Sequence, residues 1–197
     1  MNVHNDYLHG SKLAALLIDF DGTLFLTQTA NAKAYQEALA FHGHNFPLQT
    51  IIEAIDSQHS SVFLPKLTGL PIGHETLKKI TEFKKLNYKN HFHLIEENSL
   101  LISFLEKIQN QVRLVLVTTA ARENVIQIMK AKELQLKFEH IVTSSDVEKT
   151  KPEPDPFLKA MELLGVNKDV AIAIDDSESG ILSAKRAGLQ VLQVHIG

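Results

Sequence analysis

Two carboxylates and a glycine follow an apolar run near the start of the chain. Residues 13–18 are continuously apolar, as in a buried strand of a parallel sheet, and residues 19–24 read Asp-Phe-Asp-Gly-Thr-Leu. Alternate side chains of an extended segment point the same way and lie about 6 to 7 Å apart, so Asp19 and Asp21 would lie on one side of the chain. A divalent cation could bind between them. Because open α/β sheets bind ligands beyond the carboxyl ends of their strands, the segment predicts an active site.

The same residues would also suit an ordinary turn after a strand, because aspartate and glycine are common in turns. Three further polar groups favour the active site over that simpler interpretation, since they follow in a fixed order and two of them come just after apolar, strand-like runs. They are Thr118 and Thr119 after residues 112–117, residues 149–157 after residues 141–142, and residues 175–180 after residues 170–174. Each is a weak signal alone, but the set predicts polar residues gathered at one edge of a sheet.

Together, these four segments resemble the four motifs of the haloacid dehalogenase-like phosphohydrolase superfamily, and they stand in that family's order over nearly the whole chain. The best matches are Asp-Phe-Asp-Gly-Thr-Leu at 19–24, Lys-Pro-x-Pro-Asp-x-Phe at 151–157 and Asp-Asp-Ser-x-x-Gly-Ile at 175–181. The layout is similar to the subgroup with a small helical cap between the first and second motifs. That subgroup includes phosphoglycolate phosphatases and β-phosphoglucomutases.

The composition favours a protein that acts on a small molecule. The chain has 197 residues, which fits a core with a modest insertion. A net charge of −3 with 22% charged residues gives no strongly basic surface, so no nucleic-acid partner is expected. The absence of cysteine excludes disulfides and Cys-based zinc sites. Residues 13–18 are too short for a membrane span, and residues 1–12 lack the pattern of a signal peptide, so we expect a cytoplasmic protein without a membrane partner.

From residue 99 onward, helical and strand-like periodicities alternate, which predicts a parallel sheet with right-handed crossovers. The expected helices are 100–109, 123–133, 156–164 and 178–187, and the expected strands are 13–18, 113–118, 140–143, 170–174 and 191–194. Gly188 would close the last helix in a left-handed conformation. The predicted fold class is therefore α/β, with a Rossmann-like core of five parallel strands flanked by helices over residues 1–26 and 99–197.

Residues 27–98 show helical periodicity and no strand of β-branched residues, so we expect an all-helical insertion. Pro47 and Pro65 are expected to break this region, and a loop is expected at residues 68–73. We interpret the insertion as a cap domain. Its hinges would lie where it joins the core, near residues 24–27 and 96–99.

Hydrolysis of a phosphate ester needs a nucleophile, a proton donor and concentrated positive charge. An aspartate with an ordinary pKa of about 3.9 is ionised at neutral pH, so Asp19 could attack phosphorus without a base. The family resemblance implies that Asp19 does so and forms an aspartyl-phosphate. It also implies that Asp21 protonates the leaving oxygen and later accepts a proton from water. Thr118 and Lys151 complete the set of expected catalytic residues.

The crowded carboxylates also predict a metal ion. Four acids at one strand edge would repel each other and the substrate unless a hard cation neutralised them, and oxygen ligands suit Mg²⁺. The resemblance implies that Asp19, the backbone carbonyl of Asp21, and Asp176 contact this ion. Asp175 would either bind it through water or only orient the site.

The phosphate contacts are expected from several motifs. The Thr118 hydroxyl and the amide that follows it can donate to a phosphoryl oxygen, and Lys151 would balance the charge of nucleophile and phosphate. Further candidate substrate contacts are Gly22, Thr23, Thr119 and Lys66. Thr119 stands where relatives often carry asparagine, so the contacts of that asparagine do not carry over. Lys66 belongs to the insertion, where a lysine would equally suit a solvated surface.

The function expected from these residues is a Mg²⁺-dependent phosphohydrolase for a small phosphorylated metabolite, a phosphomonoester. One alternative is a sugar phosphomutase of the same superfamily, but Asn31 and Ile72 stand where the mutases carry a histidine and a basic residue. A second alternative is a phosphate-binding regulatory protein without turnover. The motifs leave the particular phosphomonoester and the oligomeric state open, because cap shape sets the substrate.

Overall fold

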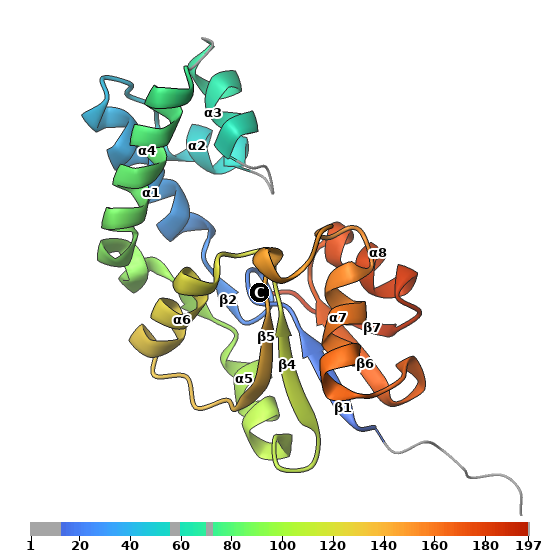
Figure 1. The fold of residues 1–197 in the computed structure, drawn as a ribbon. Coiled ribbons are helices and arrows are strands. Elements are labelled where there is room, and N and C mark those ends of the chain that lie inside the picture. Colours follow the sequence, from blue (N-terminus) through green and yellow to red (C-terminus); the bar gives the residue numbers. More distant parts are fainter. Residues whose placement is uncertain (1–12, 56–59, 70–72, 197) are drawn as a thin grey trace, which may run out of the picture. The chain divides into compact units, whose positions relative to one another are not determined.

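The computed structural model describes residues 13–55, 60–69 and 73–196, and the chain divides into two compact units (Figure 1). The first, which we call the core unit, runs through Leu24 and continues over Asn98–Ile126 and from Leu134 onward. The second, which we call the helical unit, consists of Phe25–Glu97 and Gln127–Glu133. Each unit has its own set of packed elements and is described by itself.

The core unit is built on a parallel sheet. Its described strands, in chain order, are β1 (Ala15–Ile18), β4 (Arg113–Val117), β5 (Phe138–Val142), β6 (Ala171–Asp175) and β7 (Gln190–Gln193). They lie in the order β5-β4-β1-β6-β7, and all neighbours run parallel. In register, Leu17 of β1 lies opposite Val115 of β4 and Ala173 of β6. The carboxyl ends of these three strands therefore meet at one edge of the sheet.

Helices cover this sheet, which explains why its central strands are apolar throughout. The helices of the core unit are α5 (Ser99–Ile108), α7 (Asp155–Leu164) and α8 (Glu178–Arg186), together with the first half of α6 (Arg122–Ala131), whose residues from Gln127 onward belong to the helical unit. Buried residues of α7 and α8, such as Phe157 and Ala184, pack with Leu17 and Val115 in one hydrophobic core. The alternate strand residues are buried too, as at Ile18 with 0% exposure. Both faces are thus removed from water, so polar residues enter the central strands only at their ends.

The helical unit surrounds a separate apolar core. It contains α1 (Gln28–Phe41), α2 (Leu48–Ile55), α3 (Ser60–Thr68), α4 (His74–Asn87) and the 3₁₀ turn Tyr88–Leu94. Side chains from the four α-helices meet in this core, among them Leu39, Ile51, Phe63 and Ile80. The ring of Tyr35 meets that of Phe63 edge to face, with centroids 5.0 Å apart. Burial of these side chains stabilises helices that are too short to persist alone.

The five-stranded parallel α/β core expected from the sequence is confirmed, with element ends shifted by at most about two residues, as is usual. Gly188 follows α8 with φ of +82° and donates its amide to the carbonyl of Lys185, as a left-handed cap requires. Among the described helices, none combines the length and the apolar character that a membrane span requires.

Two expectations for the insertion were wrong. Glu96–Glu97 forms a strand, β3, which pairs antiparallel with β2 at Phe25–Leu26, although no strand was expected between residues 27 and 98. Strands of two residues leave no alternating pattern, so only the pairing of distant segments creates them. Pro65 lies inside α3 and does not end it. The buried neighbours Phe63 and Leu64 hold this turn of helix despite the lost backbone donor.

Candidate active site

The candidate site lies at the carboxyl ends of β1, β4 and β6. Asp19 directly follows β1, and its amide donates to the carbonyl of Ile174 at 2.9 Å, which continues the ladder between β1 and β6. Asp175 is the last residue of β6, and Asp176 follows it. The three carboxylates therefore reach the same edge from two neighbouring strands, because both strands run in the same direction and end in register.

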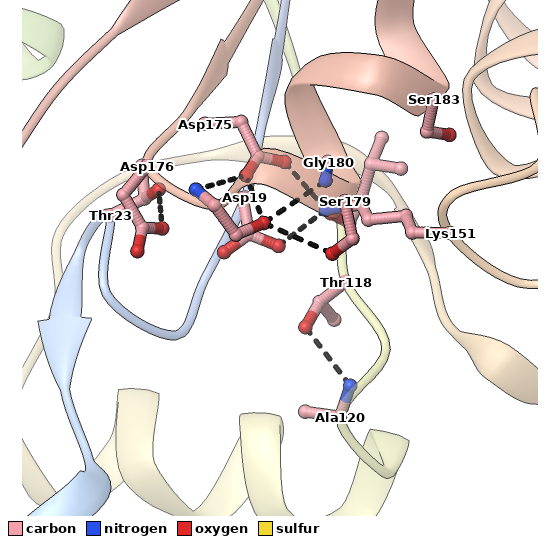
Figure 2. Close-up of polar contacts among 12 residues, drawn as sticks. Asp19, Thr23, Thr118, Ala120, Lys151, Asp175, Asp176, Ser179, Gly180 and Ser183 are labelled. Atoms are coloured by element: carbon pink, nitrogen blue, oxygen red, sulfur yellow. Dashed lines mark hydrogen bonds and ion pairs between the residues drawn. The ribbon is translucent and has the colours of Figure 1, made fainter. Parts of the chain in front are cut away.

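Lys151 joins two of these acids. Its ammonium donates to Asp19 Oδ1 at 2.5 Å, to Asp175 Oδ2 at 2.8 Å and to the carbonyl of Val117 at 2.8 Å (Figure 2). The side chain is only 3% exposed, and its charged end lies 5.3 Å from the centre of the Phe157 ring. All three donors of the ammonium are thus used, which fixes its position.

Asp175 is fully buried and hydrogen-bonded on both oxygens. Besides Lys151, it accepts from the amide of Ser177 at 3.0 Å and from the Ser177 hydroxyl at 2.8 Å. A side chain on Gly180 would overlap this carboxylate, so the start of α8 must come close to it. Asp175 is therefore occupied in holding Lys151 and the first turn of α8.

Asp176 has different surroundings from its neighbour. It is only partly buried, and its Oδ1 accepts from the hydroxyl of Thr23 at 2.8 Å. Gly22 has φ of +86°, and a Cβ there would collide with the Asp176 carboxylate. Glycine at this position thus serves both the turn and the close approach of the acid. Asp176 keeps lone pairs available on the accessible side of the site.

The three acids form a cluster with the donor set of a hard cation. One carboxylate oxygen each from Asp19, Asp175 and Asp176 lies within 4.8 Å of the other two. Within residues 13–55, 60–69 and 73–196, no other group of His, Asp or Glu side chains meets this condition. Three carboxylates face the single ammonium of Lys151, so negative charge is in excess. The residues present therefore fit a divalent cation held by oxygen ligands.

Burial and the neighbouring charges shift the pKa values of Asp19, Asp176 and Lys151. Burial raises the pKa of Asp19 well above its ordinary value, and the negative charges of Asp175 and Asp21 raise it further, while Lys151 opposes the rise. Burial also raises the pKa of Asp176. Burial by itself would lower the pKa of Lys151, but Asp19 and Asp175 raise it above its usual range, so the lysine stays charged.

The expectation that Asp19 is ionised at neutral pH stays a prediction, and the folded chain changes the surroundings on which it depends. It rested on the ordinary pKa of an exposed aspartate, whereas the folded chain removes the carboxyl from water and places two further acids beside it. A cation against the three carboxylates would favour the ionised form of Asp19. Ionisation of Asp19 and binding of the cation would therefore favour each other.

The remaining expected residues differ in how the structure places them. Thr118 is 3% exposed, and its hydroxyl oxygen accepts from the amide of Ala120 at 3.0 Å, so the hydroxyl hydrogen can point to another acceptor (Figure 2). Asp21 begins the turn after Asp19 and is partly exposed, and Thr119 is exposed. Lys66 is exposed on α3 in the helical unit, and its expected substrate contact stays a prediction. Residues 70–72, which belong to the loop expected from the sequence at residues 68–73, lie outside the described residues.

The sequence motifs did not predict the hydrogen bonds that hold the loop carrying Lys151 against α8. Ser183, fully buried in α8, donates its hydroxyl to the carbonyl of Glu153 at 2.5 Å. Arg186 donates to the carbonyl of Pro152 at 3.1 Å and to the Glu153 carboxylate at 3.0 Å. Ser183 and Arg186 are three residues apart, so their spacing places both on one face of the helix, and the sequence could have indicated this much.

Comparisons with known proteins agree with this architecture. The family model described as haloacid dehalogenase-like hydrolase matches residues 16–194. The pyrophosphatase PpaX of Bacillus cereus (strain AH820) is 26% identical over 194 residues, and the match covers 93% of this chain and 83% of that protein.

Two solved structures also share the fold. One, from Lactobacillus plantarum, is provisionally assigned as a phosphoglycolate phosphatase and has 25% identity and a TM-score of 0.74, over 91% of this chain and 85% of that one. The other, from Thermotoga maritima, is provisionally assigned as a β-phosphoglucomutase and has 25% identity and a TM-score of 0.76, over 93% and 87%. The resemblance seen in the motifs is confirmed, and the chain belongs to the haloacid dehalogenase-like hydrolase family.

Proposed function

We propose that the protein is a Mg²⁺-dependent phosphatase that hydrolyses a small phosphomonoester through an aspartyl-phosphate on Asp19. The observation that carries the proposal is the buried contact of Lys151 with both Asp19 and Asp175, beside the accessible Asp176. This arrangement combines a carboxylate nucleophile, a fixed positive charge and a set of oxygen ligands. Phosphoryl transfer requires these three elements.

Asp19 is the proposed nucleophile. The backbone bond to Ile174 and the contact with Lys151 hold its carboxylate at the strand edge. Attack by one carboxylate oxygen forms the bond to phosphorus as the bond from phosphorus to the ester oxygen breaks. Asp21 would protonate that leaving oxygen and would then accept a proton from the water that hydrolyses the aspartyl-phosphate.

Lys151 and Thr118 would stabilise the transferred group. Lys151 stays charged and already lies against Asp19, so it can neutralise charge on the phosphoryl oxygens without moving. The Thr118 hydroxyl can donate to a phosphoryl oxygen, because its own oxygen accepts from Ala120. Asp175 would keep Lys151 in position and would not touch substrate.

Mg²⁺ would be held by Asp19, Asp176 and the backbone carbonyl of Asp21, which offer only oxygen ligands. When bound, the ion would neutralise phosphate charge and favour the ionised form of Asp19. Thr23 and Gly22 would keep the Asp176 carboxylate in place, by a hydrogen bond and by leaving room for it.

We also propose that the helical insertion over residues 27–98 acts as the cap. Hydrolysis of an aspartyl-phosphate needs controlled access of water, which an uncovered strand edge does not provide. Lys66 and the loop at residues 68–73 are the proposed source of substrate contacts from this unit.

The test is a panel of phosphorylated metabolites assayed for phosphate release with and without Mg²⁺. Phosphoglycolate and pyrophosphate belong in the panel, because relatives of this chain carry their names. A hexose 1-phosphate should be followed for isomerisation as well as release, because another relative is provisionally assigned as a mutase. The Asp19→Asn variant serves as the control for contaminating phosphatase.

The outcomes separate the candidate functions. Mg²⁺-dependent release that Asp19→Asn abolishes supports the phosphatase. Isomerisation without release would assign the mutase, and preferred hydrolysis of pyrophosphate would move the substrate class from esters to anhydrides. Phosphate binding without turnover of any compound would favour the regulatory alternative.

A further inference from the structure

Asn98 connects the first motif to the start of α5 inside the core unit. Its side-chain amide donates to the carbonyl of Thr23 at 3.0 Å, while its Oδ1 accepts from the amide of Leu101 at 3.1 Å. Its own backbone amide donates to the carbonyl of Leu24 at 2.9 Å. Asn98 is therefore both the N-cap of α5 and a support for the turn at residues 22–24.

That turn lies against the accessible acid of the site. Thr23 is fully buried, and its hydroxyl donates to Asp176 Oδ1 at 2.8 Å. Gly22 leaves no room between its own Cα and the Asp176 carboxylate, so a shift of this turn would displace or release the acid. A hydrogen bond from the Leu24 amide to the Phe20 carbonyl closes the turn on one side, and the hydrogen bond from the Asn98 side chain holds it on the other.

We propose that Asn98 is a positioning residue for the metal site, because it fixes Thr23 and, through Thr23, the carboxylate of Asp176. This inference rests on the proposed Mg²⁺ site. A helix cap that stabilised α5 alone would need only the acceptor Oδ1. The donor on the same side chain is directed to the first motif, and that is the contact on which the inference depends.

The two roles of Asn98 can be separated by substitution. Asn98→Asp keeps an acceptor for the Leu101 amide but replaces the donor that reaches Thr23 with a second oxygen. Asn98→Ser keeps a capping oxygen, adds no charge and removes the amide donor. The negative charge of the aspartate variant would favour cation binding, so a loss of Mg²⁺ affinity in both variants could not be a charge effect.

The experiment measures Mg²⁺ binding to the whole chain by calorimetry, with thermal unfolding of the metal-free protein as the stability readout. We expect both Asn98 variants to bind Mg²⁺ about fivefold more weakly with little change in Tm, and Thr23→Val to bind about tenfold more weakly. Activity should fall at low Mg²⁺ and recover when Mg²⁺ saturates the site. Asn167→Asp, at another N-cap whose Oδ1 accepts from the Asp169 amide at 2.9 Å, is the matched control and should change affinity less than twofold.

A double-mutant cycle tests the route through Thr23. If Asn98 acts through Thr23, the variant with both Asn98→Ser and Thr23→Val should bind Mg²⁺ about as weakly as Thr23→Val alone. Affinity within twofold of wild type in both Asn98 variants would overturn the inference, and so would losses that simply multiply in the double variant. A wild-type chain that binds no Mg²⁺ would instead overturn the proposed function.

Discussion

Acids follow three strands of the core sheet, and they fall into two regions with opposite electrostatics. At the ends of β1 and β6, Asp19, Asp175 and Asp176 form one cluster in which Lys151 contacts only Asp19 and Asp175, and burial raises the pKa of Asp19 and Asp176. After β5, Asp146 accepts from the backbone amide and the hydroxyl of Thr143 and from Arg122, at 2.6 to 2.8 Å. There, burial is outweighed by these hydrogen bonds, and the pKa of Asp146 is lowered.

The two regions differ in whether the fold itself stabilises the charge of an acid at a strand end. Asp146 caps a turn and is matched by donors, so its charge is stabilised by the fold. Asp19 and Asp176 have the opposite balance, because burial outweighs the hydrogen bonds that they accept and raises their pKa values. An unmatched cluster is the arrangement that a bound cation and a phosphate group would complete.

The largest effect is expected from Asp19→Asn. The variant removes the nucleophile with almost no change in volume, so kcat should fall by about 10⁴-fold or more. Lys151 would still contact Asp175, so circular dichroism and Tm should show a folded protein. A folded variant with the wild-type rate of phosphate release would contradict the covalent mechanism.

Lys151→Met tests the electrostatics of the buried side of the site. It leaves Asp19 and Asp175 without their shared cation, so the free energy of unfolding in urea should fall by about 3 kcal/mol, with loss of activity. Arg122→Met is the matched change in the other region. Its partner Asp146 is partly exposed, so the loss there should be about 1 kcal/mol or less. Equal losses would remove the distinction between the two regions.

Asp176→Asn and metal removal test the accessible side. Chelation should stop turnover, because without the cation the three acids repel the substrate. Added Mg²⁺ should restore it. The variant should raise the Mg²⁺ concentration for half-maximal rate by at least about tenfold. Asp169→Asn, at an exposed acid of the core unit, controls for the general loss of charge. Full activity after exhaustive chelation would rule out the proposed metal site.

The smallest effect is expected from Asp146→Asn. At pH 7 it should lower the free energy of unfolding by about 1 kcal/mol, because hydrogen bonds to an ionised acceptor are lost. The folded pKa of Asp146 is below its ordinary value of 3.8, so its ionised form contributes stability above that value. As pH falls through the folded pKa, this contribution is lost and the two unfolding curves should converge. A difference that stayed constant down to about pH 2 would show that the charge is not responsible.

The core sheet and the position of its polar edge could be predicted from the amino-acid sequence. The strands β1, β4 and β6 are apolar apart from Arg113 at the start of β4 and Asp175 at the end of β6, because both faces of a parallel sheet are buried, and each run leads to a polar residue. Strands that run parallel bring those ends to one edge, so the meeting of Asp19, Thr118 and Asp175 follows from the order of the runs. The local signal at Gly188 was sufficient as well, since a left-handed residue after a helix favours glycine.

The acids at that edge differ in burial and hydrogen bonding, and these differences could be seen only in the tertiary structure. Asp175 and Asp176 are adjacent and identical in type, yet one is fully buried with three donors and the other is partly exposed beside Thr23. The raised pKa of Asp19 likewise arises from burial and from Asp175, an acid more than a hundred residues away along the chain, while the equally distant Lys151 opposes the rise. Desolvation and the distance between charges depend on which segments pack together, and a linear pattern records neither.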